Sequence, residues 1–225
     1  MPVVHGRPFA PDHVVLAGAS TGAGWRRSVP DAVDQVGDLV TRSEVEGALN
    51  VYDEPACVAA GEELGAATRR VDALRGYLSS RWAAATVLVG EAPGKDGARW
   101  TGVPFTSRRQ LTGSGPDETT ARTVHRVLAE LGLSERVLLW NASMLFAPGN
   151  RDPRRSALDA SAVVLDLVCR GRSVLAVGRY AQRATGAPYL RHPSHGGASL
   201  FATGLREALC PSAHADARIL PTGGR

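Results

Sequence analysis

The sequence has few cysteines, and none of them are grouped. Its three cysteines are widely spaced along the chain and form no Cys-x-x-Cys pair: Cys57, Cys169 and Cys210. Structural zinc sites and iron–sulfur clusters usually need four ligands from closely placed residues. We therefore expect three free thiols, no metal or iron–sulfur cluster, and no cofactor.

Long hydrophobic runs are also missing. No apolar segment approaches the roughly 20 residues that a membrane-spanning helix needs. The short run at residues 14–17 has neither the basic flank nor the cleavage site of a signal peptide. We therefore expect a cytoplasmic protein that does not act at a membrane. We also expect a monomer.

Lysine is nearly absent, and two nucleotide-binding classes are excluded by the residues around the single lysine. Gly18, Gly22 and Gly24 have the spacing of a short-chain dehydrogenase loop, but that class needs a Tyr-x-x-x-Lys pair. The only lysine is Lys95, and Glu91 stands where the tyrosine would be. A P-loop ending at Lys95 fails as well, because Val89 replaces its first glycine and Asp96 its Ser or Thr.

The positive charge of the chain is carried by arginine. The net charge is +4, and 25 of the 26 basic residues are arginine, a bias that a GC-rich genome would also produce. Residues 151–225 hold eleven arginines against five acids. Because guanidinium groups bind phosphates in bidentate geometry, the C-terminal third is the part expected to face a nucleic acid.

The chain is long enough for one well-packed domain. It has 225 residues, 44% of them hydrophobic. We expect an irregular extension over residues 1–45, a domain over 46–210 and a flexible tail over 211–225. The domain alternates short apolar runs with amphipathic stretches, which is typical of an α/β fold with a parallel sheet. Expected strands are 86–90, 137–141, 173–178 and 189–192, and expected helices are 58–79, 119–131, 157–169, 181–185 and 200–209.

Polar residues lie where each expected strand ends. Glu91 follows the first strand, Asn141 ends the second, Arg179 follows the third and His192 ends the fourth. Open parallel sheets hold their ligands at the carboxyl ends of the strands. We therefore expect these residues to meet in one crevice.

Four segments at these strand ends resemble motifs of the uracil-DNA glycosylase superfamily, in the right order over about residues 50–209. Gly90-Glu-Ala-Pro-Gly94, followed by Thr101-Gly-Val-Pro-Phe-Thr-Ser107, is similar to its first motif, and Arg191-His-Pro-Ser-His-Gly-Gly197 to its second. Between them, Leu139-Trp-Asn-Ala142 and Val177-Gly-Arg-Tyr-Ala-Gln182 resemble connecting segments. The best match is a bacterial branch with these motifs. The resemblance implies a three-layer α/β/α sandwich around a four-stranded parallel sheet.

The resemblance also implies a DNA glycosylase that flips a non-standard pyrimidine out of DNA and hydrolyses its bond to the sugar. The departing base becomes anionic, and His192 could donate a hydrogen bond to its carbonyl oxygen. The sugar becomes cationic, and Glu91 could stabilise it and orient water. In the best-known branch an aspartate stands at the position of Ala92, so Asp96 is a further candidate for the water.

Four residues are expected to line the pocket for the base. Phe105 matches the aromatic that stacks on the flipped base. Asn141 matches the amide that reads its pairing edge, and an amide can turn over to read either uracil or cytosine. Gly94 replaces a tyrosine that excludes 5-substituted pyrimidines, so we expect open space there, with Ala92 also lining the pocket.

Contacts to DNA phosphates are expected from small residues at helix starts and from nearby cations. The candidates are Gly90, Lys95, Thr106, Ser107, Arg179, Ser194, His195, Gly196 and Gly197. Arg99, Arg108, Arg109 and Arg191 are supplementary cations, and Leu200 or His195 is the candidate wedge into the duplex.

Three functions remain open from the sequence. The first is removal of uracil or a related deaminated base. The second is removal of bulky 5-modified cytosine from phage DNA as an antiviral defence, which space at Gly94 favours. The third is a module that binds DNA without cutting it, which Ala92 allows.

Overall fold

A four-stranded parallel sheet forms the centre of the fold. The computed structural model describes residues 28–149 and 154–210. In spatial order the strands are β3 (Val137–Asn141), β2 (Thr86–Gly90), β5 (Ser173–Val177) and β6 (Tyr189–Leu190). The sequence predicted all four, and for β2 and β3 the bounds agree at both ends. The expected fourth strand is shorter, because only Tyr189 and Leu190 pair with β5.

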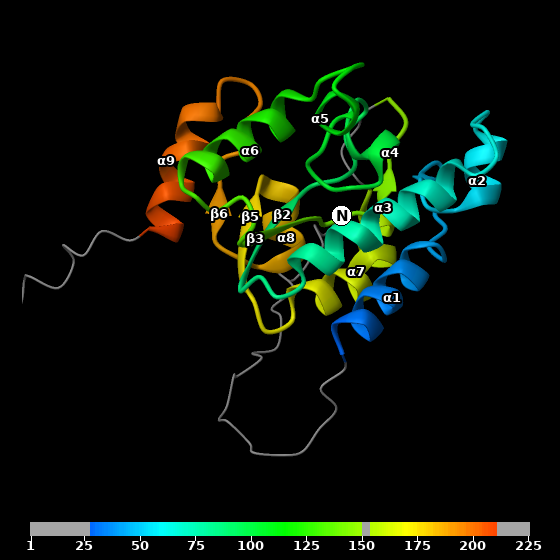
Figure 1. Ribbon diagram of the computed structural model, residues 1–225, viewed down its shortest axis with the longest axis horizontal. Coiled ribbons are helices and arrows are strands. Elements are labelled where there is room, and N and C mark those ends of the chain that lie inside the picture. Colours follow the sequence, from blue (N-terminus) through cyan, green and yellow to red (C-terminus); the bar gives the residue numbers. More distant parts are fainter. Residues whose placement is uncertain (1–27, 150–153, 211–225) are drawn as a thin grey trace, which may run out of the picture.

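Helices cover both faces of this sheet, which confirms the three-layer α/β/α sandwich (Figure 1). One face packs against α1 (Val29–Val40), α3 (Ala66–Arg81), α7 (Arg155–Cys169) and α8 (Arg179–Thr185). The other face packs against α6 (Thr119–Glu130) and α9 (Ala198–Leu209).

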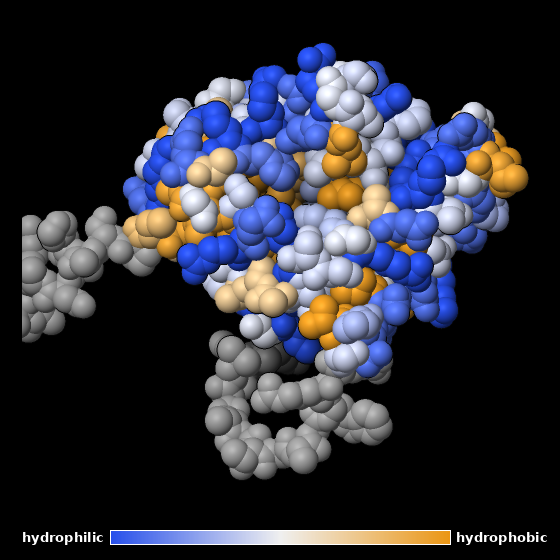
Figure 2. Space-filling model, viewed as in Figure 1, coloured by the Kyte–Doolittle hydropathy of each residue, from blue (hydrophilic) through white to orange (hydrophobic). Residues whose placement is uncertain are grey.

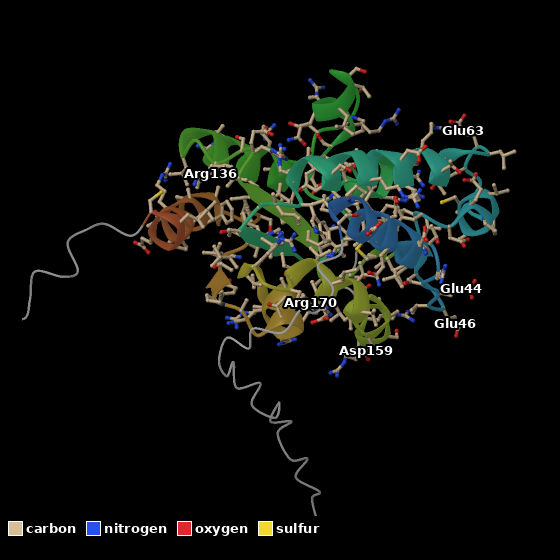
Figure 3. All side chains as sticks on the ribbon, turned by 60° about the horizontal axis from the view of Figure 1, so that its bottom comes forward. Glu44, Glu46, Glu63, Arg136, Asp159 and Arg170 are labelled. Carbon is tan, nitrogen blue, oxygen red and sulfur yellow. The ribbon has the colours of Figure 1, made fainter. Side chains whose placement is uncertain are left out.

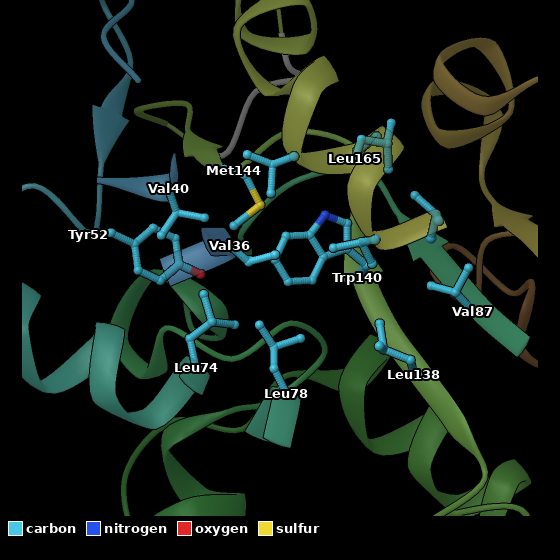
Figure 4. Close-up of a cluster of buried hydrophobic side chains, with 14 of the residues drawn as sticks. Val36, Val40, Tyr52, Leu74, Leu78, Val87, Leu138, Trp140, Met144 and Leu165 are labelled. Atoms are coloured by element: carbon cyan, nitrogen blue, oxygen red, sulfur yellow. The ribbon is translucent and has the colours of Figure 1, made fainter. Parts of the chain in front are cut away.

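Side chains of each strand alternate between the two layers, and both layers are apolar. On β2, Val87 and Val89 enter the first core while Leu88 enters the second. On β3, Trp140 is completely buried among side chains from α1 and α3 (Figure 4). Burial of apolar side chains on both faces holds the strands rigidly, so the residues at their ends are held in place as well.

The prediction of an irregular N-terminal extension is wrong for residues 29–40, which form α1. Ser28 caps this helix through a capping box with Asp31, and Val33, Val36 and Val40 are buried against the sheet layer. The box and the apolar spacing were visible in the sequence. Residues 1–27 and the expected tail at 211–225 lie outside the described residues.

The long helix expected at 58–79 is two helices, α2 (Glu54–Ala59) and α3. Gly61 and Gly65 separate them, with φ angles of +83° and +86°. Gly61 follows the end of α2, and Gly65 is the N-cap residue of α3. Four short elements were not expected from the sequence: β1 (Leu49–Asn50), β4 (Leu145–Phe146), α4 (Ala98–Thr101) and α5 (Arg108–Thr112).

Charged side chains lie around the outside of this core. The residues labelled in Figure 3 project outward from the ribbon: Glu44, Glu46, Glu63, Arg136, Asp159 and Arg170. Hydrophilic residues dominate the face drawn in Figure 2, with only small separate apolar groups. No helix among the described residues is long and apolar enough to cross a membrane. Cys57, Cys169 and Cys210 are free thiols.

Candidate active site

A cleft of about 650 Å³ lies at the carboxyl ends of the strands. All four strands of the sheet contribute, as the sequence predicted. Its lining includes Gly90 at the end of β2 with Glu91 after it, Asn141 of β3, Gly178 and Arg179 after β5, and Arg191 and His192 after β6. The structure therefore brings together the four strand-end side chains singled out in the sequence.

The backbone of Gly90 lies against both the aromatic ring of Phe105 and the side-chain amide of Asn141. A Cβ atom at Gly90 would lie 2.5 Å from Cζ of Phe105 and 3.0 Å from Oδ1 of Asn141. Only a residue without a side chain leaves room for both groups. The predicted stacking ring and the predicted base-reading amide thus share one wall of the cleft.

Phe105 is held in an unusual backbone conformation. Its φ angle is +55°, a region that bulky residues seldom occupy. The Nε2–H of His125 on α6 donates to the Phe105 carbonyl oxygen at 2.9 Å. Burial lowers the pKa of His125, so the ring stays neutral at neutral pH. His125 is a positioning residue that the sequence did not reveal.

The segment before Phe105 is anchored from behind by two buried side chains. The Tyr52 hydroxyl donates to the Gly102 carbonyl at 2.7 Å. Arg70 packs against Gly102 so closely that a Cβ there would lie 2.5 Å from the Cβ of Arg70. Arg70 also forms an ion pair with Glu62, and Glu62 lies 3.3 Å from Arg99. Arg99 of α4 is therefore held beside Glu62, behind the segment that leads to Phe105.

We expect Gly90→Ala to lower kcat/KM by at least about 10-fold, because the new methyl group must displace the ring or the amide. The protein should still fold, since Gly90 ends its strand. Single-turnover kinetics with a melting curve would test this. Gly76→Ala is the matched control, because nothing lies within 4 Å of a Cβ at that position. Unchanged kinetics in Gly90→Ala would show that Phe105 and Asn141 do not act together.

The imidazole of His192 is fixed by its neighbour Ser194. The backbone N–H of Ser194 donates to Nδ1 at 3.2 Å, and the Ser194 hydroxyl lies 2.7 Å from the same nitrogen. An N–H can only donate, so Nδ1 is the acceptor and the neutral ring carries its proton on Nε2. Burial, with smaller contributions from Arg191 and His195, lowers the pKa of His192. His192 is therefore a neutral donor in the cleft at neutral pH.

The carboxylate of Glu91 packs against the backbone of Gly178. A Cβ at Gly178 would collide with Oε1 of Glu91, and Gly178 also has a φ of +93°. Gly178 is the residue before α8, so the end of β5 is shaped around this carboxylate. Glu91 reaches from the end of β2 across to the end of β5, and it lines the cleft.

Open space was expected at Gly94, and that prediction is wrong. A Cβ at Gly94 would lie 2.7 Å from Oε1 of Glu118, whose carboxyl fills the position. Glu118 precedes α6 and lines the cleft together with Lys95 and Asp96. Glu118 could not be singled out from the sequence, since an acid before a helix is an ordinary capping residue. Here it makes no capping hydrogen bond.

Two of the residues expected to contact DNA phosphates have side chains that cannot do so. Ser107 is completely buried and bonds Gln110 and Asp117. Thr106 is 8% exposed, and its hydroxyl donates to the Val103 carbonyl at 2.6 Å. These predictions are wrong for the side chains because both hydroxyls are used inside the loop.

The other expected DNA contacts lie in or beside the cleft. Lys95, Arg179, Ser194 and His195 line it. Gly196, with a φ of +74°, and Gly197, which packs on the His192 carbonyl, shape the loop that carries His192. Leu200 is 65% exposed in the first turn of α9. A wedge role for Leu200 or His195 stays a prediction.

No group of three or more His, Cys, Asp or Glu side chains within residues 28–149 and 154–210 is arranged to hold a metal ion. The lining of the cleft offers carboxyl, imidazole, amide and guanidinium groups.

The chain is similar to one known protein family and to several solved structures. A model of the uracil DNA glycosylase superfamily matches residues 79–222. Among solved structures, the chain is similar to SMUG2 of Pedobacter heparinus, with 12% identity and a TM-score of 0.52 over 79% of this chain and 96% of that one. UNG of Nitratifractor salsuginis gives 15% identity and a TM-score of 0.39 over 82% and 97%. A search of curated proteins found no match.

Proposed function

The chain belongs to the uracil DNA glycosylase superfamily, and from that premise we propose that it removes uracil or a related deaminated base from DNA. The observation that supports this most is the meeting of Phe105, Asn141, Glu91 and His192 in one cleft. Each of these residues suits one part of the reaction, and no cofactor is needed for it.

The base would leave its stack and enter the cleft, with Phe105 against its face and Asn141 at its pairing edge. As the bond from the base nitrogen to carbon 1′ of the sugar breaks, its electron pair moves onto the base. The Nε2–H of His192 stabilises the charge that develops on the base oxygen. Glu91 stabilises the cationic sugar and orients a water, whose oxygen bonds to carbon 1′. The proton released by the water neutralises the base, and an abasic site remains.

The decisive experiment is an assay for abasic sites. The protein would be incubated with DNA containing uracil, hypoxanthine or a glucosylated 5-hydroxymethylcytosine, and the strand would then be cleaved with alkali. We expect cleavage at uracil or another deaminated base. A protein that binds all three DNAs and yields no abasic site would be a non-catalytic binding module.

Removal of bulky 5-modified cytosine loses its main support. That function rested on open space at Gly94, and the carboxyl of Glu118 takes up this space. The assay above includes such a base, so preferential cleavage of it would overturn the proposal for deaminated bases.

A further inference from the structure

The charged residues that line the cleft are divided between its two halves. Strands β5 and β6 lie side by side at one edge of the sheet (Figure 1). The lining residues that belong to β6 or follow β5 and β6 include Arg179 and Arg191 and no acid, and the sequence has no Asp or Glu over residues 167–206. The other half carries one cation, Lys95, against three acids. These acids come from the segments after β2 and before α6: Glu91, Asp96 and Glu118.

A DNA strand therefore meets different electrostatic fields in the two halves. Guanidinium groups attract the phosphates of the strand, and carboxylates repel them. The backbone of a strand that delivers one base into the cleft is thus favoured over the half formed by β5 and β6. The extruded base itself lies in the other half, where Phe105 and Asn141 contact the position of Gly90.

Tyr189 is an aromatic side chain on the basic half that the reaction as described does not use. It is the first residue of β6, it lines the cleft, and it is 38% exposed. The backbone on both sides of it is fixed to the end of β5. The carbonyl oxygen of Pro188 accepts from the N–H of Ala176 at 2.9 Å, and that of Leu190 accepts from the N–H of Gly178 at 3.0 Å. A ring held on such a backbone can stack with little loss of conformational entropy.

The ring of Tyr189 lies too far from Phe105 to hold the same base. Adjacent strands of a sheet are about 4.8 Å apart, and β5 lies between β2 and β6, so Tyr189 is about 10 Å from the end of β2. A ring at that distance can meet a base beside the extruded one along the strand.

Arg179 lies next to this ring, with its Cζ 5.9 Å from the ring centroid of Tyr189. Its side chain is exposed and lines the same cleft. An aromatic ring stacks on a base of any identity, and a guanidinium group binds a phosphate. A second pair follows on α8, where Cζ of Arg183 lies 5.7 Å from the ring centroid of Tyr180, which also lines the cleft.

We propose that Tyr189 and Arg179 form a subsite for the nucleotide next to the extruded one. The ring stacks on the base of that nucleotide, and the guanidinium group binds its phosphate. This inference rests on the proposed function and deepens it, because it adds a contact outside the base pocket. The contact exists on one side only, since Phe105 is the one aromatic among the described residues that line the other half, and the extruded base occupies it.

Binding to uncleavable single-stranded DNA tests this without relying on catalysis. Three oligonucleotides would carry one central 2′-fluoro-deoxyuridine: one with both neighbouring bases, one with a tetrahydrofuran abasic residue on the 5′ side, and one with it on the 3′ side. For the wild type, loss of one neighbouring base should raise Kd by about 10-fold, the size of one base–aromatic stack. Loss of the other should change Kd little.

Variants assign this dependence to the subsite. Tyr189→Ala should bind the intact oligonucleotide about 10-fold more weakly and bind all three alike, whereas Tyr189→Phe keeps the ring and the wild-type pattern. Arg179→Ala should lower the slope of log Kd against log salt by about 0.7, the value for one phosphate of a single strand. The matched controls are Val163→Ala and Arg155→Ala, which remove an exposed apolar group and an exposed charge from α7, outside the cleft.

Failure of this inference can be told apart from failure of the proposed function. It is overturned if the wild type does not bind the intact oligonucleotide, ignores both neighbouring bases, or depends on them equally. It is also overturned if folded Tyr189→Ala keeps the one-sided dependence. One-sided dependence in a protein that yields no abasic site would leave the subsite in place and remove the glycosylase activity. Cleavage of uracil DNA without that dependence would remove the subsite alone.

Discussion

His192→Ala should lower kcat by about 100-fold or more and leave the Kd for DNA nearly unchanged. The hydrogen bond from Nε2–H strengthens only as negative charge builds on the departing base, so its loss falls on the transition state. Ser194 holds the ring through its hydroxyl and its backbone N–H, which lie 2.7 and 3.2 Å from Nδ1 of His192. The proton of the neutral ring is therefore on Nε2. Single-turnover rates and binding isotherms on the same uracil duplex would measure both quantities.

His195→Asn provides the contrast, because His195 lines the same cleft three residues further on. Its φ of +51° is a conformation that asparagine tolerates well. If His195 contacts the duplex, this variant should weaken binding and change the rate of the bound complex little. Equal losses of binding and turnover in His192→Ala would assign His192 to substrate binding and not to departure of the base.

Much of the sheet could be predicted from the sequence. Strands β2 and β3 are continuous apolar runs, and a parallel sheet covered on both faces needs side chains of that kind. Because the carboxyl ends of parallel strands meet at one edge, the meeting of Glu91, Asn141 and His192 followed from the same reasoning. The error at α1 came from treating a mixture of Gly, Pro and charged residues as irregular, although Ser28 and Asp31 marked a helix start.

The parts of the site that could not be predicted depend on packing between distant segments. Glu118 lies 24 residues after Gly94, and nothing in either segment shows that the carboxyl fills the space of the missing side chain. The hydrogen bond from His125 to Phe105 likewise joins residues 20 positions apart. The burial of Ser107 depends on Gln110 and Asp117, which draw its hydroxyl inward. Such contacts arise from the tertiary fold and leave no local pattern.

Glu91→Gln should lower kcat by about 100-fold with little change in melting temperature. The amide keeps the shape of the carboxylate, so it can occupy the same space against Gly178. It carries no charge to stabilise the cationic sugar, and it is a poor acceptor for a proton from water. The rate of the bound complex should therefore fall while folding and DNA binding are kept. A large drop in melting temperature would instead make Glu91 a structural residue.

Asp96→Asn is the matched variant that decides between the two carboxylates, since Asp96 lines the cleft on the loop after β2. If Glu91 carries the reaction, Asp96→Asn should lose much less activity than Glu91→Gln. A loss in Asp96→Asn as deep as that in Glu91→Gln would place water activation at Asp96.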